Sequence, residues 1–206
     1  PDRCHFARGT CREPDWGEAH CMRPHLVYLA NSSGAKVGIT TRGGERTRWL
    51  DQGATQGLVV AEAATRHLAG VVEATLARLV SDRTDWRALL REDAAPVDLP
   101  ALRDGLRSRI GPLPEGVSWR DDGRVETLAF PVSGYPARLE RLTLDAHPRI
   151  AGKLVGIKGQ YLLFEHGVLN VRRHRGYHVR AILTDEPLAP VPAPADTNDS
   201  QMELFS

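Results

Sequence analysis

The spacing of apolar and polar positions changes near residue 111 of the chain. Before that point, short apolar runs closed by turn residues predict strands at 26–30, 36–40 and 58–63. Apolar residues that recur at helical spacing predict a helix at 67–80, and break, cap and stop residues predict helices at 45–52, 85–90 and 100–110. The first part of the chain is therefore expected to form a small sheet with helices.

After Gly111, prolines and glycines mark irregular chain, and short alternating segments follow. These segments predict strands at 141–144, 153–157, 161–164, 168–173 and 177–183. The end of the chain sets four prolines among alanines and acids, a composition typical of an extended tether. The fold class expected from these patterns is α+β.

The same patterns divide the chain into four parts. We expect a zinc-binding Cys/His segment at 1–25, an α/β core at 26–111, a small basic antiparallel β-sheet domain at 112–184 and a disordered tether at 185–206. The first of these parts holds too few apolar residues to build a core alone.

The overall composition is that of a soluble globular protein. Hydrophobic residues make up 41% of the 206 residues and charged residues 26%. No apolar run approaches the ~18 residues of a membrane span, and no secretory signal is visible. A cytoplasmic location without membrane attachment is therefore expected.

The net charge of +1 hides an uneven distribution of charge. The stretch 149–180 contains seven lysines and arginines against one acid, whereas the stretch 184–206 contains five acids and no lysine or arginine. The chain therefore combines a basic segment with an acidic tail.

Side chains that suit phosphodiester chemistry lie between residues 28 and 73. Tyr28 belongs to the first strand of a hairpin, and Lys36 and Gly38 belong to the second. Arg46 follows in an arginine-rich segment, and Glu73 interrupts an apolar helix. A hydroxyl near an attacking water, cations for the phosphate and an acid for a divalent metal are the groups that such chemistry needs.

Leu26-Val27-Tyr28 and Lys36-Val37-Gly38, in this order before Glu73, resemble a divergent form of the GIY-YIG endonuclease superfamily. The resemblance covers about residues 26–90. It implies that Tyr28 helps to activate water, that Arg46 stabilises the phosphate charge and that Glu73 holds one divalent ion, Mg²⁺ or Mn²⁺. It also makes Lys36 a candidate catalytic residue.

The chain departs from that superfamily at three points. The first motif lacks its glycine, Lys36 stands in place of the second aromatic residue, and Asp85 stands near the place of an asparagine. The stretch 25–90 also resembles a bacterial family of unknown function that carries a Cys/His cluster just before these strands. A plainer interpretation makes Tyr28 a core aromatic residue and Glu73 the partner of a surface arginine.

Three cysteines and a histidine near the start of the chain could hold a structural Zn²⁺. Cys4, Cys11, Cys21 and His25 are separated by six, nine and three residues, and four such ligands complete a tetrahedral site. His5 or His20 could replace His25. The alternatives are unrelated thiols, or a disulfide with one cysteine left over, which the lack of a secretory signal disfavours.

The basic segment is a candidate nucleic-acid surface. If 168–173 and 177–183 are adjacent strands, alternate positions place Arg172 and Arg180 on one face. The full set of candidate contacts is Lys158, Arg172, Arg173, Arg175 and Arg180. Phosphates favour such a surface, although an ordinary solvated face would have the same pattern.

The tail ends in Gln201-Met202-Glu203-Leu204-Phe205, which resembles the short peptide by which bacterial replication and repair proteins dock on the DNA sliding clamp. The resemblance implies that Gln201, Leu204 and Phe205 contact the clamp. Alternatively, Leu204 and Phe205 fold back onto the globule.

Three functions are consistent with these features. The first is a metal-dependent nuclease or nuclease-like protein of DNA repair or replication. The second is a non-catalytic nucleic-acid-binding adaptor on a degenerate nuclease fold. The third is a protein-interaction module whose basic face serves protein partners. DNA is the expected nucleic acid, and the sliding clamp is the expected protein partner.

Overall fold

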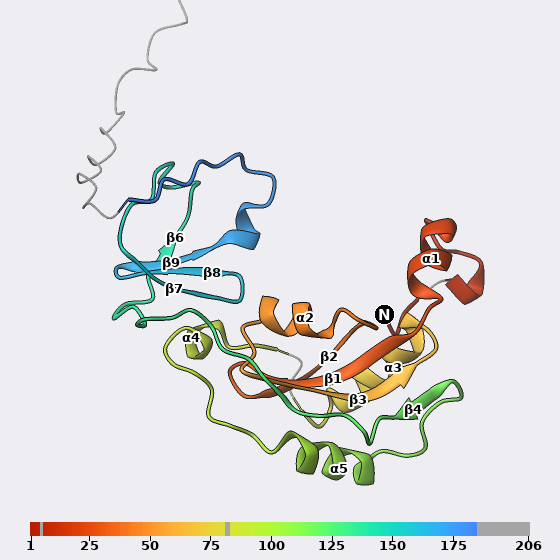
Figure 1. Ribbon diagram of the computed structural model, residues 1–206. Helices are drawn as coiled ribbons and strands as arrows, with labels where there is room; N and C mark the ends of the chain where they lie inside the picture. Colours follow the sequence, from red (N-terminus) through yellow and green to blue (C-terminus); the bar gives the residue numbers. More distant parts are fainter. Residues whose placement is uncertain (5, 81–82, 185–206) are drawn as a thin grey trace, which may run out of the picture.

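The computed structural model describes residues 1–4, 6–80 and 83–184 and shows an α+β fold with two sheets (Figure 1). Strands of the first sheet run in the order β2-β1-β3-β4, with β5 also pairing with β3. All of these pairs are antiparallel. The strands are β1 (His25–Asn31), β2 (Ala35–Thr41), β3 (Gln56–Ala63), β4 (Val117–Trp119) and β5 (Glu126–Thr127).

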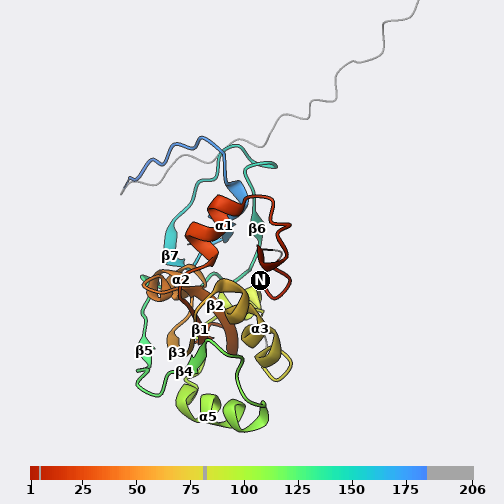
Figure 2. The same cartoon turned by 90° about the vertical axis from the view of Figure 1, so that its right-hand side faces the viewer.

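Helices cover both faces of this sheet. They are α1 (Pro14–Cys21), α2 (Glu45–Asp51), α3 (Arg66–Leu76), α4 (Trp86–Leu89) and α5 (Leu99–Arg109). Helix α2 lies on one face, whereas α3 and α5 share a hydrophobic core with the other face. Figure 2 shows α5 on the side of the sheet opposite α2.

Strand β1 lies inside the sheet, and all seven of its residues are buried. Because successive side chains of a strand point to opposite faces, its residues contribute to two cores. Val27 and Leu29 pack with the helices α3 and α5. Tyr28 and Ala30 pack on the other face with Trp49 of α2. Tyr28 is therefore directed toward α2, on the side of the sheet where the second sheet lies (Figure 1).

Helix α3 begins and ends differently from the sequence-based expectation of 67–80. The Thr65 side chain caps its start by accepting a hydrogen bond from the backbone N–H of Leu68. The helix ends at Leu76, because the N–H groups of Leu79 and Val80 both bond to the Leu76 carbonyl in a closing turn. Its buried stripe includes Val72, so Glu73 sits at the border of that stripe.

The second sheet contains β6 (Arg141–Leu142), β7 (Leu154–Lys158), β8 (Tyr161–Phe164) and β9 (Gly167–Asn170), in the order β6-β9-β8-β7. Its pairs are antiparallel apart from β6 with β9, which is parallel. Two short 3₁₀ helices, η1 (Phe6–Arg8) and η2 (Val171–His174), complete the described elements.

Two of the expected strands of the second sheet need correction. The strand expected at 168–173 ends at Asn170, whose side chain accepts a hydrogen bond from the Arg173 N–H and starts η2. The stretch 177–183 forms no regular element and is exposed. Arg172 and Arg180 therefore do not share a face of adjacent strands.

The second sheet packs on the core through aromatic and backbone contacts. Trp86 of α4 stacks with Tyr161 of β8 at 6.5 Å between ring centroids. Leu89 of α4 and Leu163 of β8 belong to a third hydrophobic cluster, which joins the helix to the second sheet. Gly159, in the β7–β8 turn with a φ of 58°, approaches the backbone after α2 so closely that a Cβ there would lie 2.9 Å from the Gly53 nitrogen. The position of the second sheet over α2 is thus fixed by packing.

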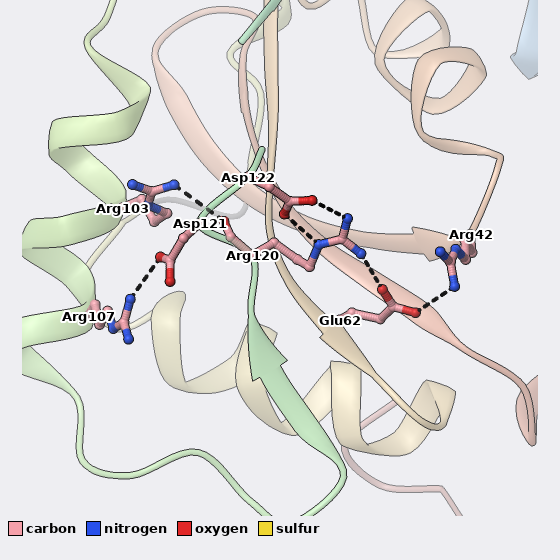
Figure 3. A network of polar contacts seen from close by, with 7 residues as sticks. All are labelled: Arg42, Glu62, Arg103, Arg107, Arg120, Asp121 and Asp122. Carbon is pink, nitrogen blue, oxygen red and sulfur yellow. Dashed lines mark hydrogen bonds and ion pairs between the residues drawn. The ribbon is translucent and has the colours of Figure 1, made fainter. Parts of the chain in front are cut away.

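Charged side chains connect α5, β3 and the segment after β4 at one edge of the first sheet (Figure 3). Arg120, after β4, bonds to both oxygens of Asp122 at 2.9 Å and to Glu62 of β3 at 2.6 Å. Glu62 also pairs with Arg42 at 3.1 Å. Arg107 of α5 bonds to Asp121 at 2.8 Å. These contacts tie α5 and the β4 segment to β3, so the first sheet extends beyond residue 111, where the sequence suggested a boundary.

The expected tether and its peptide ending in Leu204-Phe205 lie outside the described residues. Within the described part of the chain, no helix combines the length and apolarity needed to cross a membrane.

Candidate functional site

A cleft of about 690 Å³ opens along strand β2, between α2, α3 and the start of η2. It brings together Tyr28, Lys36 and Glu73, three of the four residues that the sequence suggested for catalysis. Its other polar lining residues are His25, Thr40, Thr41, Arg48, Gln52, Arg66, Thr84 and Arg172.

The hairpin register explains how Tyr28 reaches this cleft. Tyr28 lies directly opposite Gly38 in the pairing of β1 with β2. A Cβ at Gly38 would lie only 2.5 Å from the tyrosine hydroxyl oxygen, so the absence of a side chain there lets the phenol ring lie across β2. Trp49 packs edge-on against the ring, with 6.0 Å between centroids. The glycine of the second motif is thus a requirement of the tyrosine's position.

The hydroxyl of Tyr28 is held as a neutral group. The side chain is 1% exposed, and burial raises the pKa of Tyr28 above its ordinary value. Gln52 donates a hydrogen bond to the hydroxyl oxygen at 2.7 Å and, like the nearby charge of Arg48, opposes that rise in pKa. Because the oxygen accepts from Gln52, the hydroxyl proton can be donated to a water or an anion in the cleft.

Lys36 of β2 is buried, whereas lysine side chains usually lie in water. It is 6% exposed, and its ammonium donates to the hydroxyl of Thr84. Burial lowers the pKa of Lys36 to about 8, and the positive charge of Arg48 adds to this effect. Lys36 therefore changes its protonation state close to neutral pH, which an ordinary surface lysine does not.

The arginine of α2 that lines the cleft is Arg48, whereas Arg46, the arginine chosen from the sequence, does not line it. Arg46 forms an ion pair with Glu126 of β5. Arg48 is exposed and lines the cleft together with Arg66, the first residue of α3. The charge of Arg48 affects the pKa of both Tyr28 and Lys36, so it lies close to both groups.

His25 lines the cleft. From the sequence it was expected only as a zinc ligand. It starts β1, is 3% exposed and hydrogen-bonds through Nδ1 to the Arg23 carbonyl at 2.8 Å. Burial lowers the pKa of His25, and the charge of Arg66 lowers it further. A neutral imidazole is therefore favoured at this end of the cleft. On a regular strand His25 and Tyr28 would point to opposite faces, so no signal in the sequence indicated this placement; the pairing of β1 with β3 is irregular between Val27 and Tyr28.

The expected zinc ligands do not come together in the described structure. Cys4, Cys11 and Cys21 are free thiols, and His25 faces the cleft. Among residues 1–4, 6–80 and 83–184, no three His, Cys, Asp or Glu side chains are placed to hold a metal ion. His5 lies outside the described residues. The zinc site stays a prediction without support from this geometry, and elemental analysis of protein purified without chelator tests it.

The five candidate nucleic-acid contacts form three groups: a buried lysine, two arginines that line the cleft or a pocket beside it, and two exposed arginines that line neither. Lys158 is fully buried, and its ammonium donates to the Glu92 carbonyl at 3.1 Å, to Asp93 at 2.7 Å and to Tyr135 at 2.8 Å. It is a structural residue, which corrects its inclusion among the candidate nucleic-acid contacts.

Only part of the remaining basic set faces the cleft. Arg172, the second residue of η2, lines it, and Arg175 lines an adjacent pocket. Arg173 and Arg180 are exposed and line neither space. The second sheet therefore contributes to the cleft through one arginine of the short helix η2, and not through a basic sheet face.

The charges of the cleft suit an anion with a bound divalent metal. Lys36, Arg48, Arg66 and Arg172 are cationic when protonated. In the described part of the chain, Glu73 is the single carboxylate that lines the cleft. Mg²⁺ commonly uses one or two carboxylates, several waters and substrate phosphates, so a Glu73 site completed by water and phosphate fits this donor set.

Comparison with known proteins identifies a family but no activity. Residues 1–179 match the model of a family described as "Protein of unknown function (DUF2797)". No curated protein and no solved structure matches the chain. The expectation of a family of unknown function is confirmed, and the likeness to GIY-YIG nucleases stays a prediction.

Proposed function

We propose a function from the chemistry of the cleft, because the chain belongs to the DUF2797 family, whose description names no activity. The proposed function is that of a nucleic-acid-binding phosphodiesterase that depends on a divalent metal and acts on DNA in repair or replication. This goes beyond the family assignment and rests on the residues described above.

The observation that supports it is the convergence of Tyr28, Glu73 and Arg48 on one cleft. They come from three different elements, β1, α3 and α2. A neutral hydroxyl donor, one carboxylate and a cation are the groups that in-line attack on a phosphodiester requires. An ordinary solvated surface gives no reason for the tyrosine and a lysine to be buried beside such charges.

Each group has a role that follows from its environment. Arg48 and Arg172 bind the non-bridging oxygens of the phosphate, because a guanidinium donates two parallel hydrogen bonds to such an anion. The Tyr28 hydroxyl, fixed by Gln52, donates to the attacking water or to a phosphate oxygen and orients it. Glu73 would hold the divalent ion, which would supply Lewis-acid stabilisation of the phosphate charge when bound.

Lys36 suits proton transfer near neutral pH. Its pKa of about 8 leaves a fraction of the amine neutral under physiological conditions. The neutral amine can accept the proton of the attacking water, a task for which the Tyr28 phenol is unsuited because burial raises its pKa. The replacement of an aromatic residue by Lys36 is therefore compatible with catalysis.

The second candidate is a non-catalytic nucleic-acid-binding adaptor. It is favoured by one specific observation, the almost complete burial of Tyr28 with its hydroxyl bonded to Gln52, which is also the arrangement of a purely structural tyrosine. In that case the cleft binds a phosphate without cleaving it.

The clamp-binding peptide remains a separate part of the proposal. Met202, Leu204 and Phe205 are apolar residues at the end of a proline-rich acidic stretch, outside the described residues. Tethering would raise the local concentration of the peptide once the cleft has bound DNA. Titration of purified clamp with peptide 196–206 tests this, and equal binding by a Gln201→Ala, Leu204→Ala, Phe205→Ala peptide would refute it.

A cleavage assay distinguishes the two candidates. End-labelled single-stranded, duplex and flap DNA are incubated with the protein in Mg²⁺, Mn²⁺ or EDTA. We expect metal-dependent cleavage that Glu73→Gln abolishes while DNA binding persists. Glu126→Gln, outside the cleft, is the matched control and should cleave normally. Binding without cleavage in either metal would establish the adaptor function instead.

A further inference from the structure

We propose that a second pocket beside the cleft holds an unpaired nucleobase of the strand whose phosphate lies in the cleft. The pocket measures about 470 Å³ and lies between α2 and the second sheet. The inference rests on the proposed function and specifies its substrate class as DNA with unpaired nucleotides next to the bound phosphate.

The pocket and the cleft are parts of one groove. Arg48 of α2 and Arg172 of η2 line both of them. Arg175, three residues further along the chain, lines the pocket but not the cleft. A phosphate bound between Arg48 and Arg172 therefore has the pocket on one side and Tyr28 and Glu73 on the other. A nucleotide attached to that phosphate would extend directly into the pocket.

The pocket walls suit a base better than a second phosphate. Ile157 and Val171 present apolar side chains that are 43% and 51% exposed, on a surface that is otherwise rich in arginine. Asp51 places a carboxylate in the same wall, which repels phosphate but accepts hydrogen bonds from the amino groups of bases. The pocket thus combines apolar contact surface with a hydrogen-bond acceptor.

Tyr161 gives the pocket a rigid aromatic wall. Its ring stacks at an interplanar angle of 15° on Trp86, which also carries the Arg141 guanidinium 5.1 Å from its ring centroid. These contacts hold Tyr161 in place without a ligand. A prearranged aromatic side chain favours stacking with a base.

A base in an intact duplex cannot enter this pocket. It would have to leave the stack and lose its pairing partner, which is unfavourable. A base in a single strand, a flap or a frayed end avoids that cost. Discrimination between these substrates should therefore depend on the pocket, whereas attraction of the phosphates depends on the arginines shared with the cleft.

The test measures binding of two probes to the full chain carrying Glu73→Gln, which prevents cleavage. The probes are a short fluorescent single strand and the same sequence as a blunt duplex. Ile157→Ser with Val171→Ser removes two apolar contacts of the bound base, so it should weaken binding of the single strand by about tenfold and change duplex binding little. Leu154→Ser with Val179→Ser removes two exposed apolar side chains that do not line the pocket and is the matched control.

The possible outcomes separate this inference from the proposed function. Equal loss for both probes, or no loss for either, would overturn the base pocket while leaving the phosphate cleft intact. If the Glu73→Gln protein with an unaltered pocket binds neither probe at low salt, the base pocket and the proposed function are both overturned. If the serine variant unfolds, the parent Glu73→Gln protein is tested with 2-aminopurine placed along the strand. Quenching confined to one position supports the pocket, and uniform fluorescence contradicts it.

Discussion

Replacement of Gly38 by alanine should destabilise the protein by displacing Tyr28. The added Cβ would lie 2.5 Å from the hydroxyl oxygen and 2.6 Å from Cζ of Tyr28, far inside van der Waals contact. The ring cannot move freely, because Gln52 holds its hydroxyl and Trp49 packs edge-on against it with 6.0 Å between ring centroids. Such overpacking costs about 1–3 kcal/mol.

Part of that cost is offset, because alanine restricts the unfolded chain more than glycine does, by about 0.4–1 kcal/mol. The net loss expected in the free energy of unfolding is therefore about 1–2 kcal/mol. Urea denaturation followed by tryptophan fluorescence measures it. Gly105→Ala in α5 is the control, because a Cβ there meets nothing within 4 Å and should stabilise the helix by up to about 1 kcal/mol. A Gly38→Ala protein as stable as its parent would refute the reasoning.

Two further predictions concern the buried lysines. The folded pKa of Lys36, about 8, lies below its ordinary value of 10.5, so the unfolded chain binds more protons between these values and stability rises with pH there. Lys36→Met should therefore be more stable than its parent at pH 7, by up to about 3 kcal/mol, with an advantage that shrinks above pH 8 in pH-dependent urea titrations; a constant difference would contradict this. Lys158→Met should lower the melting temperature, because it removes the ammonium shared by Asp93 and Tyr135, yet leave DNA affinity unchanged. Lost affinity without lost stability would return Lys158 to the binding surface.

The first sheet was predictable because its signals are local. Turn residues mark the hairpin of β1 and β2, and the helical spacing of apolar residues marks α3. The opposition of Tyr28 and Gly38 follows from the hairpin register. The convergence of Tyr28, Lys36 and Glu73 on one cleft followed from the same local signals.

The choice between Arg46 and Arg48 depended on information that the local sequence does not contain. On a helix these two positions are about 200° apart, and Trp49 is the buried residue of α2 between their two directions. The sequence therefore implies that only one of them can face β2. Which one does so depends on β5, a strand about 80 residues later in the chain. Its register on β3 places Glu126 where it pairs with Arg46.

The second sheet was less predictable, because its charges are organised by long-range packing. Lys158 precedes a turn glycine and has the pattern of a surface cation, but the sheet packs it against Asp93 and Tyr135. The alternating stretch 177–183 has the pattern of a strand and finds no pairing partner in the described structure. Alternation shows that a segment is compatible with a sheet, whereas pairing depends on which edges are available.

The salt dependence of DNA binding tests most directly whether the cleft is the nucleic-acid site. Each lost phosphate contact should reduce the slope of log affinity against log salt by roughly 0.7–0.9. Arg48→Ala with Arg172→Ala should therefore reduce it by roughly 1.4–1.8, whereas Arg46→Ala with Arg180→Ala, which removes the same charge outside the cleft, should leave it nearly unchanged. Equal slopes for the two double variants would place the binding surface elsewhere and contradict the account.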